Sequence, residues 1–218
     1  MSWASRAIPP CGGLRISGFG LGAHQHHRLQ PLAFSQQRTL QEMIRSRLTS
    51  TQRIQVADSM MNGQDVLSSV MRSDFDRLRM VADKADRREF DRVVDELVRA
   101  RHIYILGVRS SSFVAAYLNF YMHLLLDNVT LVQSNEAGAI FEQLFRIGPG
   151  DVMLAISFPR YSKITINTAK FAKNRGATIL GITDNELSPL GQMSSAAVLA
   201  PSEMISFVDS MVAPMSMV

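Results

Sequence analysis

The sequence predicts an α/β fold over residues 86–218: a doubly wound, five-stranded parallel sheet in the flavodoxin-like three-layer α/β/α arrangement. Short runs rich in β-branched residues alternate along this segment with longer amphipathic stretches, which is typical of successive strand-helix units. The short runs also lack the polar alternation of a strand that faces water on one side. We therefore expect a sheet covered on both faces, preceded by a helical linker and an irregular amino-terminal tail.

The stretch 86–100 shows the clearest helical pattern in the chain. Its apolar residues recur at the spacing i, i+3, i+4, i+7 and i+8, whereas nearly every other position is charged. This pattern predicts a surface helix whose apolar side lies on another apolar surface. The apolar residues are Phe90, Val93, Val94, Leu97 and Val98.

A regular alternation of strands and helices follows this first helix. The expected strands cover residues 103–106, 129–132, 152–156, 178–182 and 197–200. The expected helices between them cover residues 111–126, 136–145 and 162–175.

The last ten or so residues show an apolar stripe at helical spacing. Val208, Met211, Val212 and Met215 lie on one side of the expected helix, and the sequence stops at Val218 without a capping residue. We expect a shortened carboxyl-terminal helix whose stripe needs a partner surface, and hence a homodimer.

Upstream of residue 86 the organisation is looser. Residues 1–31 are rich in proline, glycine and histidine without a sustained apolar period, and we expect an irregular basic tail there. His24, His26 and His27 have no carboxylate or thiolate at ligand spacing, so we assign no metal site and no cofactor. Residues 32–85 predict short helices that form a linker.

Charge is distributed unevenly along the chain. Residues 1–50 contain six arginines and one acid, and the remaining residues contain 17 basic and 18 acidic side chains within the total net charge of +4. Contact with nucleic acid, an organelle transit peptide and a segment that does not fold are three interpretations of the basic start.

Composition fits one domain of ordinary size with an accessory segment. Hydrophobic residues make up 46% of the 218 residues, and no apolar stretch reaches the ~18 residues that cross a bilayer. The single cysteine, Cys11, cannot form an internal disulfide, which fits a reducing compartment. We therefore expect a cytoplasmic protein without a membrane partner.

Two serine-bearing turns mark the expected binding site. In the flavodoxin-like order, ligands lie beyond the carboxyl ends of the first and third strands, where the strand order reverses. Each of these strands is followed by a serine-rich turn into a helix, which suits a phosphate because helix starts and hydroxyls offer hydrogen-bond donors. The residues proposed to hold it are Gly107, Arg109, Ser110, Ser111, Ser157, Arg160 and Ser162.

Simpler interpretations of these residues stay open. Ser111 and Ser162 could act only as helix N-caps. Glu136, just after the second strand, could reach the site or could only stabilise the positive end of its own helix. Gly107 is a single glycine, so dinucleotide binding has little support.

Several short motifs in this segment resemble a known family. These motifs are Ile103 to Gly107 with Ser110-Ser111, Gly148-Pro149-Gly150-Asp151-Val152, Ile156-Ser157, Gly176-Ala177, Ile182-Thr183-Asp184 and Leu187-Ser188-Pro189-Leu190. With them the chain resembles the sugar isomerase (SIS) domain, and more closely its version in the RpiR/MurR family of bacterial transcriptional regulators.

The resemblance implies a DNA-binding helix-turn-helix followed by an SIS domain that senses a phosphosugar. It would place phosphosugar contacts on Ser110, Ser111, Ser157 and Ser162. Two departures occur in the second turn: Pro159 stands where the family usually has serine, and Arg160 stands where it usually has glycine.

The same resemblance implies that residues 32–48 are a remnant of the helix-turn-helix. Residues 1–31 do not resemble the earlier helices of that module, so we expect it to be truncated or replaced, with weak DNA binding or none.

Three functions from different classes follow from these observations. The first is a phosphosugar sensor in an RpiR-type regulator, and the second is an aldose–ketose phosphosugar isomerase. Isomerisation needs a general base, and the candidates are few: Glu136 near the site, His123 in an apolar helix and His102 at the opposite end of the first strand. We favour the sensor and assign no catalytic residue. A fragment without independent function is the third interpretation.

Overall fold

The computed structural model describes residues 49, 51–52, 54–55, 65–133, 136–202 and 209–218, all of which belong to one compact unit. The predicted tail, the helix at residues 39–48 and the helix-turn-helix remnant lie outside this part of the chain. Boundaries of the linker and of the domain therefore stay predictions.

A five-stranded parallel sheet forms the centre of the described structure. Its strands run in the order β2-β1-β3-β4-β5, with β1 between β2 and β3. This is the predicted doubly wound order, and the reversal lies between β1 and β3. The strands are β1 (His102–Gly107), β2 (Val129–Val132), β3 (Asp151–Ile156), β4 (Thr178–Thr183) and β5 (Ala196–Leu199).

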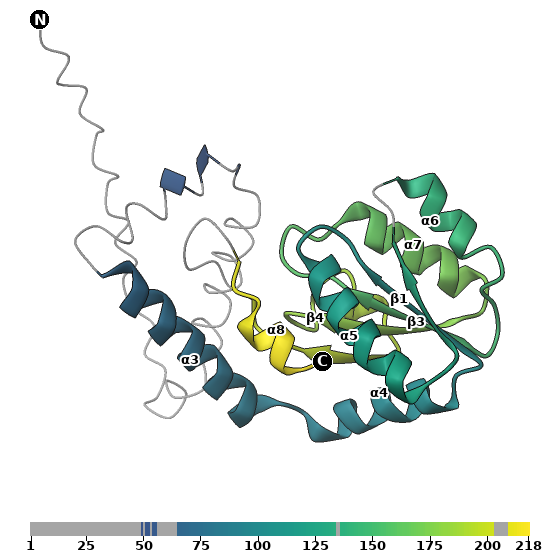
Figure 1. Ribbon diagram of the computed structural model, residues 1–218, viewed down its shortest axis with the longest axis horizontal. Helices are drawn as coiled ribbons and strands as arrows, with labels where there is room; N and C mark the ends of the chain where they lie inside the picture. The colour runs from purple at the N-terminus through teal and green to yellow at the C-terminus, as the bar shows by residue number, and fades with distance from the viewer. Residues whose placement is uncertain (1–48, 50, 53, 56–64, 134–135, 203–208) are drawn as a thin grey trace, which may run out of the picture. The chain divides into compact units, whose positions relative to one another are not determined.

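Helices cover both faces of the sheet, so the three-layer α/β/α prediction is confirmed. Ile103 and Ile105 of β1 belong to a core cluster with α4, α5 and the segment around α8, whereas Leu106 belongs to a second cluster with α6 and α7. Figure 1 shows α6 and α7 together on one side of the sheet. These helices are α4 (Arg87–Arg99), α5 (Ser111–Leu125), α6 (Ala137–Gln143), α7 (Lys163–Asn174) and α8 (Val212–Ser216).

Helix α4 begins where the sequence predicts. The carboxylate of Asp86 accepts hydrogen bonds from the backbone N–H groups of Arg88 (2.8 Å) and Glu89 (3.2 Å), which satisfies two donors of the first turn. Val93 is buried against the sheet, while Val98 remains exposed. The apolar stripe is therefore only partly covered by the chain's own core.

Helix α3 (Val66–Lys84) precedes α4 within the segment 32–85, where the sequence predicts short helices. Residues 51, 52, 54 and 55 are helical as well. Among the described residues no helix is long and apolar enough to cross a membrane.

The carboxyl-terminal stripe is partly covered by the chain itself. Met211, Met215, Met217 and Val218 are partly buried against the core cluster, and α8 also contacts α3. Val212, another residue of the predicted stripe, is 38% exposed, so the need for a partner surface stays a prediction. Val208 lies outside the described residues.

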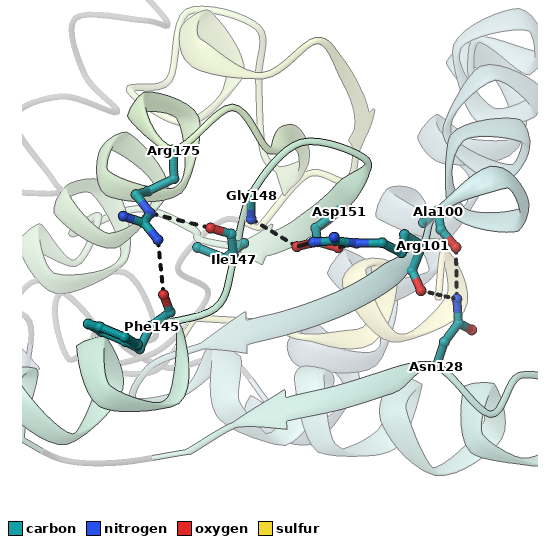
Figure 2. A network of polar contacts seen from close by, with 8 residues as sticks. All are labelled: Ala100, Arg101, Asn128, Phe145, Ile147, Gly148, Asp151 and Arg175. Atoms are coloured by element: carbon teal, nitrogen blue, oxygen red, sulfur yellow. Dashed lines mark hydrogen bonds and ion pairs between the residues drawn. The ribbon is translucent and has the colours of Figure 1, made fainter.

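Paired polar groups close the amino-terminal edge of the sheet (Figure 2). The Arg101 guanidinium donates to both carboxylate oxygens of Asp151 at 2.8 and 2.7 Å, and the Gly148 N–H donates to the same carboxylate at 2.8 Å. Arg175 donates to the carbonyl oxygens of Ile147 and Phe145. These contacts join the starts of β1 and β3 and lie at the opposite end of the strands from the predicted site.

Candidate functional site

The two predicted turns start side by side at the carboxyl-terminal edge of the sheet. Gly107, the last residue of β1, pairs with Ile156, the last residue of β3. The turn of residues 108–110 leads from β1 into α5, and the turn of residues 157–162 leads from β3 into α7. Both turns therefore lie at the strand-order reversal, as predicted.

A small hollow separates the two turns. Its volume is about 20 Å³, roughly the room for one water-sized group, so a phosphate would require side chains at the rim to move. Gly107 and Glu136 are the two predicted site residues that do not line it. The lining residues are Val108, Arg109, Ser110, Ser111, Ser157, Phe158, Pro159, Arg160 and Ser162.

Gly107 has a structural reason to be glycine. A Cβ atom at this position would collide with the backbone carbonyl group of Ser111 and would meet the Cβ of Ala115 at 3.0 Å. The absent side chain thus lets the first turn of α5 approach the end of β1. This close approach brings the N-terminus of α5 to the hollow, where its free N–H groups favour an anion.

Four serine hydroxyls face no protein partner within the described part of the chain. Ser111 and Ser157 are buried, with 5% and 2% of their surface exposed, and neither hydroxyl makes a hydrogen bond there. Ser110 and Ser162 occupy N-cap positions, but their side chains make no capping hydrogen bond. The capping interpretation therefore does not account for these serines, and their donors remain available to a ligand.

Two arginines in the turns have an unusual backbone conformation. Arg109 has a φ of 62° and Arg160 has a φ of 66°, in the left-handed region that favours glycine. Such a conformation costs about 1–2 kcal/mol for a residue with a Cβ. Arg160, which stands where the resemblance expects glycine, thus adopts a backbone conformation that glycine favours. The Ser112 hydroxyl donates to the Arg109 carbonyl at 2.6 Å and helps to hold the first turn.

The two arginines differ in their side-chain contacts. The Arg109 side chain is exposed, and no ion pair involves it within the described residues. The Arg160 guanidinium lies 3.3 Å from a carboxylate oxygen of Asp209, a residue from the chain's last segment. The sequence offered no signal for this contact because 49 positions separate the two residues.

A polar cluster beside the second turn was not predicted either. The Tyr161 hydroxyl donates to both carboxylate oxygens of Asp184 (2.9 and 3.0 Å), and Asn185 donates to the same carboxylate at 2.7 Å. Burial raises the pKa of Asp184, although these hydrogen bonds and the one from Thr183 oppose the rise. Asp184 follows β4, so the rule that polar residues gather at strand ends could have indicated it. The hydrogen bonds between Tyr161 and Asp184 could be identified only in the three-dimensional structure.

Neither the acid nor the histidines proposed as bases reach the hollow. Glu136 is the exposed N-cap residue of α6 and is not among the lining residues. His102 lies at the amino-terminal end of β1, where its Nε2 is 2.8 Å from the Thr130 hydroxyl. His123 is exposed near the end of α5. Within the described residues, no group of three or more His, Cys, Asp or Glu side chains could hold a metal ion.

Fold and site together define a class: a doubly wound α/β protein with a candidate anion site at its strand-order reversal. Comparison with known proteins identifies the family. The SIS domain family matches residues 96–218, and the chain belongs to this family.

Two solved structures share this fold. The sugar isomerase domain of an RpiR transcription factor from Sphaerobacter thermophilus superposes with a TM-score of 0.66 at 21% identity, covering 71% of this chain and 86% of that one. The NanR protein of Vibrio vulnificus, solved in complex with ManNAc-6P, gives a TM-score of 0.62 at 22% identity, covering 77% of this chain and 64% of that one. At these identities the likeness establishes the fold.

One sequence relative is a transcriptional regulator. The HTH-type transcriptional regulator HexR of Pseudomonas aeruginosa is 29% identical over 120 residues, which are 53% of this chain and 40% of HexR. The match thus spans less than half of that regulator.

Proposed function

We propose that this chain is the phosphosugar-sensing part of an RpiR-type bacterial transcriptional regulator of sugar metabolism. One observation carries the proposal: two adjacent serine turns at the sheet reversal present hydroxyls that cap no helix. The likeness to HexR supports the regulator class, and the ManNAc-6P complex of NanR supports a sugar phosphate as the ligand class.

In this proposal the phosphate binds at the hollow. Ser111 and Ser157 donate to it from the buried floor, and Ser110 and Ser162 donate from the starts of α5 and α7. The partial positive charge of each helix start adds to these hydrogen bonds. Arg109 and Arg160 add positive charge beside the hollow, for the phosphate itself and for a second acidic group on the ligand.

The proposed role is binding and not isomerisation. None of the residues that line the hollow is a histidine, aspartate, glutamate or lysine, so a general base is missing from the described lining. Isomerase activity remains the second candidate because SIS domains also occur in phosphosugar isomerases. Incubation with sugar phosphates followed by separation of aldose and ketose products distinguishes the two, and we expect no conversion above the rate without protein.

A panel of sugar phosphates tests the binding proposal. Each phosphorylated sugar is compared with its unphosphorylated parent in a thermal unfolding assay, since a ligand stabilises only the state that binds it. We expect at least one sugar phosphate to raise Tm by several degrees at about 100 times its Kd, which corresponds to about 2.7 kcal/mol. An equal response to parent sugars and sugar phosphates would contradict a phosphate site.

We also propose that the chain forms a homodimer, now through α5 instead of the carboxyl-terminal stripe. The outward face of α5 is apolar and exposed, and this helix contains no aspartate, glutamate, lysine or arginine. Isologous pairing of the same face is the commonest way to cover such a surface. Light scattering should show a dimer that Phe120→Asp converts to a monomer. The exposed residues are Phe113, Tyr117, Phe120, Tyr121, Leu124 and Leu125.

For DNA we propose weak binding without sequence preference. The six arginines before residue 50 supply phosphate contacts, whose affinity falls steeply with salt. A complex that survives excess random DNA at physiological salt would instead indicate specific readout of a base sequence.

A further inference from the structure

Arg160 is the one arginine of the hollow that the structure shows in an ion pair with a distant segment. Its guanidinium lies 3.3 Å from the carboxylate of Asp209, and the side chains are 33% and 9% exposed. The pair therefore lies at the protein surface, with the carboxylate more covered than the guanidinium. The Asp209 carboxylate is thus already paired with a guanidinium that lines the proposed phosphate site.

The segment that carries Asp209 also contacts helix α3. The neighbouring Ser210 donates its hydroxyl to the Asp74 carboxylate at 2.6 Å, and Asp74 forms an ion pair with the buried Arg77 at 3.3 Å. The α8 helix that follows lies against α3 as well. A continuous set of polar contacts therefore leads from the hollow to α3.

We propose that Asp209 is an internal competitor for the anion of the ligand. A bound phosphate group takes the Arg160 guanidinium from Asp209, and the segment 209–218 then loosens its contacts with α3. This inference rests on the proposed function, because it assigns the regulation of the same site.

The physical reason lies in the competition of two anions for one guanidinium. A guanidinium binds phosphate and carboxylate oxygens with the same planar donor geometry, so both anions compete for Arg160. Once Arg160 turns to the ligand, the Asp209 carboxylate loses one charge partner, which weakens the attachment of its segment. An uncharged sugar cannot start this exchange because it offers no anion.

The phosphate and the Asp209 carboxylate affect each other's binding to Arg160 by the same factor, so the proposal can be tested by measuring phosphate affinity. If the ligand weakens the Arg160–Asp209 pair, then loss of the pair must strengthen ligand binding by the same factor. Calorimetric titration with inorganic phosphate, the group common to all candidate ligands, tests this without knowledge of the sugar. We expect Asp209→Asn to tighten phosphate binding roughly fivefold or more.

Two further variants control this titration. Asp95→Asn removes the exposed Asp95–Arg99 pair of α4 and should leave phosphate affinity unchanged. Arg160→Gln should weaken binding, and Asp209→Asn added to it should have no further effect. Equal affinities of the wild-type protein and Asp209→Asn would overturn the competitor role while the phosphate site stands. Absence of phosphate and sugar-phosphate binding by the wild-type protein would overturn the proposed function as well.

Hydrogen exchange tests the connection to α3. Saturating phosphate should accelerate amide exchange in residues 211–217 and in α3, since their mutual contacts weaken. Ser210→Ala should abolish the phosphate response of α3, because it removes the hydrogen bond to Asp74. Exchange in α3 that ignores phosphate in the wild-type protein would overturn the coupling.

Discussion

The two ends of the parallel sheet differ in how their polar side chains are paired. At the amino-terminal end, the side chains drawn in Figure 2 pair with one another or with backbone carbonyl groups, as the double hydrogen bond between Arg101 and Asp151 illustrates. At the carboxyl-terminal end, Tyr161 and Asp184 also pair, but Ser110 and Ser162 at the two helix starts make no capping hydrogen bond. Donors without a protein partner at a strand-order reversal can hydrogen-bond a ligand.

Backbone conformation shows the same contrast. The positive-φ residues at the amino-terminal end are Gly150 (φ 83°) and Gly176 (φ 89°), which adopt this region without strain. At the carboxyl-terminal end the positive-φ residues are Arg109 and Arg160. Positive-φ residues other than glycine carry local backbone strain, and both arginines lie in the turns of the candidate site. We refer to the carboxyl-terminal end, where the candidate site lies, as the binding end and to the amino-terminal end as the structural end.

The largest expected effect concerns the structural end. Arg101→Gln leaves the Asp151 carboxylate, which is 1% exposed, without this charge partner and should lower the free energy of unfolding clearly more than the control variant does. Urea denaturation measures this change, and phosphate binding should be retained. Arg92→Gln is the matched control, because its pair with Glu89 is exposed and should contribute below about 0.5 kcal/mol. If Arg101→Gln and Arg92→Gln lowered the free energy of unfolding equally, the Arg101–Asp151 pair would have no special role in stabilising the structural end.

The second prediction concerns pH at the binding end. Burial raises the pKa of Asp184 in the folded state, so the folded protein holds this proton more tightly than the unfolded chain. The contribution of Asp184 to stability therefore falls as pH rises from the ordinary carboxyl pKa of about 3.9 through the raised value. Asp184→Asn should therefore flatten the dependence of the unfolding free energy on pH over this range, which urea denaturation at a series of pH values measures.

Asp151 at the structural end should behave in the opposite way. Burial alone would raise the pKa of Asp151, but hydrogen bonds from Arg101 and Gly148 and the charge of Arg101 hold it below its ordinary value. Its contribution is therefore present above a pH of about 3.9 and is lost as pH falls through the lowered pKa. Denaturation curves of Asp151→Asn at a series of pH values should approach the wild-type curve only in acid. If Asp184→Asn and Asp151→Asn changed the pH dependence of the unfolding free energy in the same direction, the opposite behaviour expected for the two carboxylates would be contradicted.

The smallest expected effect concerns the backbone. Gly150→Ala has space for its Cβ, whose nearest neighbour lies 3.7 Å away, so only the positive φ should lower stability, by about 1 kcal/mol. Arg109→Gly relieves the backbone strain of the folded state but increases the conformational entropy of the unfolded chain. Each effect changes the free energy of unfolding by about 1 kcal/mol, and the two nearly cancel. Thermal unfolding should therefore show a lower Tm for Gly150→Ala and little change for Arg109→Gly. A marked loss in Arg109→Gly would show that its side chain is structural.

Much of the fold followed from the sequence because strand cores are local patterns. The expected strand at residues 129–132 has the bounds found for β2, and β1, β3 and β4 differ from their predicted ranges by one residue at one or both ends. Helix α6 begins at Ala137 and ends at Gln143, shorter than the predicted 136–145. The segment contains Gly138, which lowers the helix propensity near its start.

The candidate site was predictable only in part. The strand-end rule located both serine turns because it depends on topology, and the sequence indicates topology through alternation. Contacts between distant segments carry no such local signal, so Arg160–Asp209 and Tyr161–Asp184 emerged only from the three-dimensional structure. The carboxyl-terminal stripe shows the same limit, since its spacing predicted an apolar face but not which surface covers it.

The most direct test of the binding end is a titration of the double variant Ser111→Ala with Ser157→Ala. The ligand is the sugar phosphate that raises the wild-type Tm most, and calorimetry measures its Kd for both proteins. Because both hydroxyls line the hollow and have no hydrogen-bond partner in the described structure, the account predicts at least a tenfold weaker Kd, about 1.4 kcal/mol. It also predicts a free energy of unfolding within about 1 kcal/mol of wild type. An unchanged Kd in the folded double variant would contradict the assignment of the site.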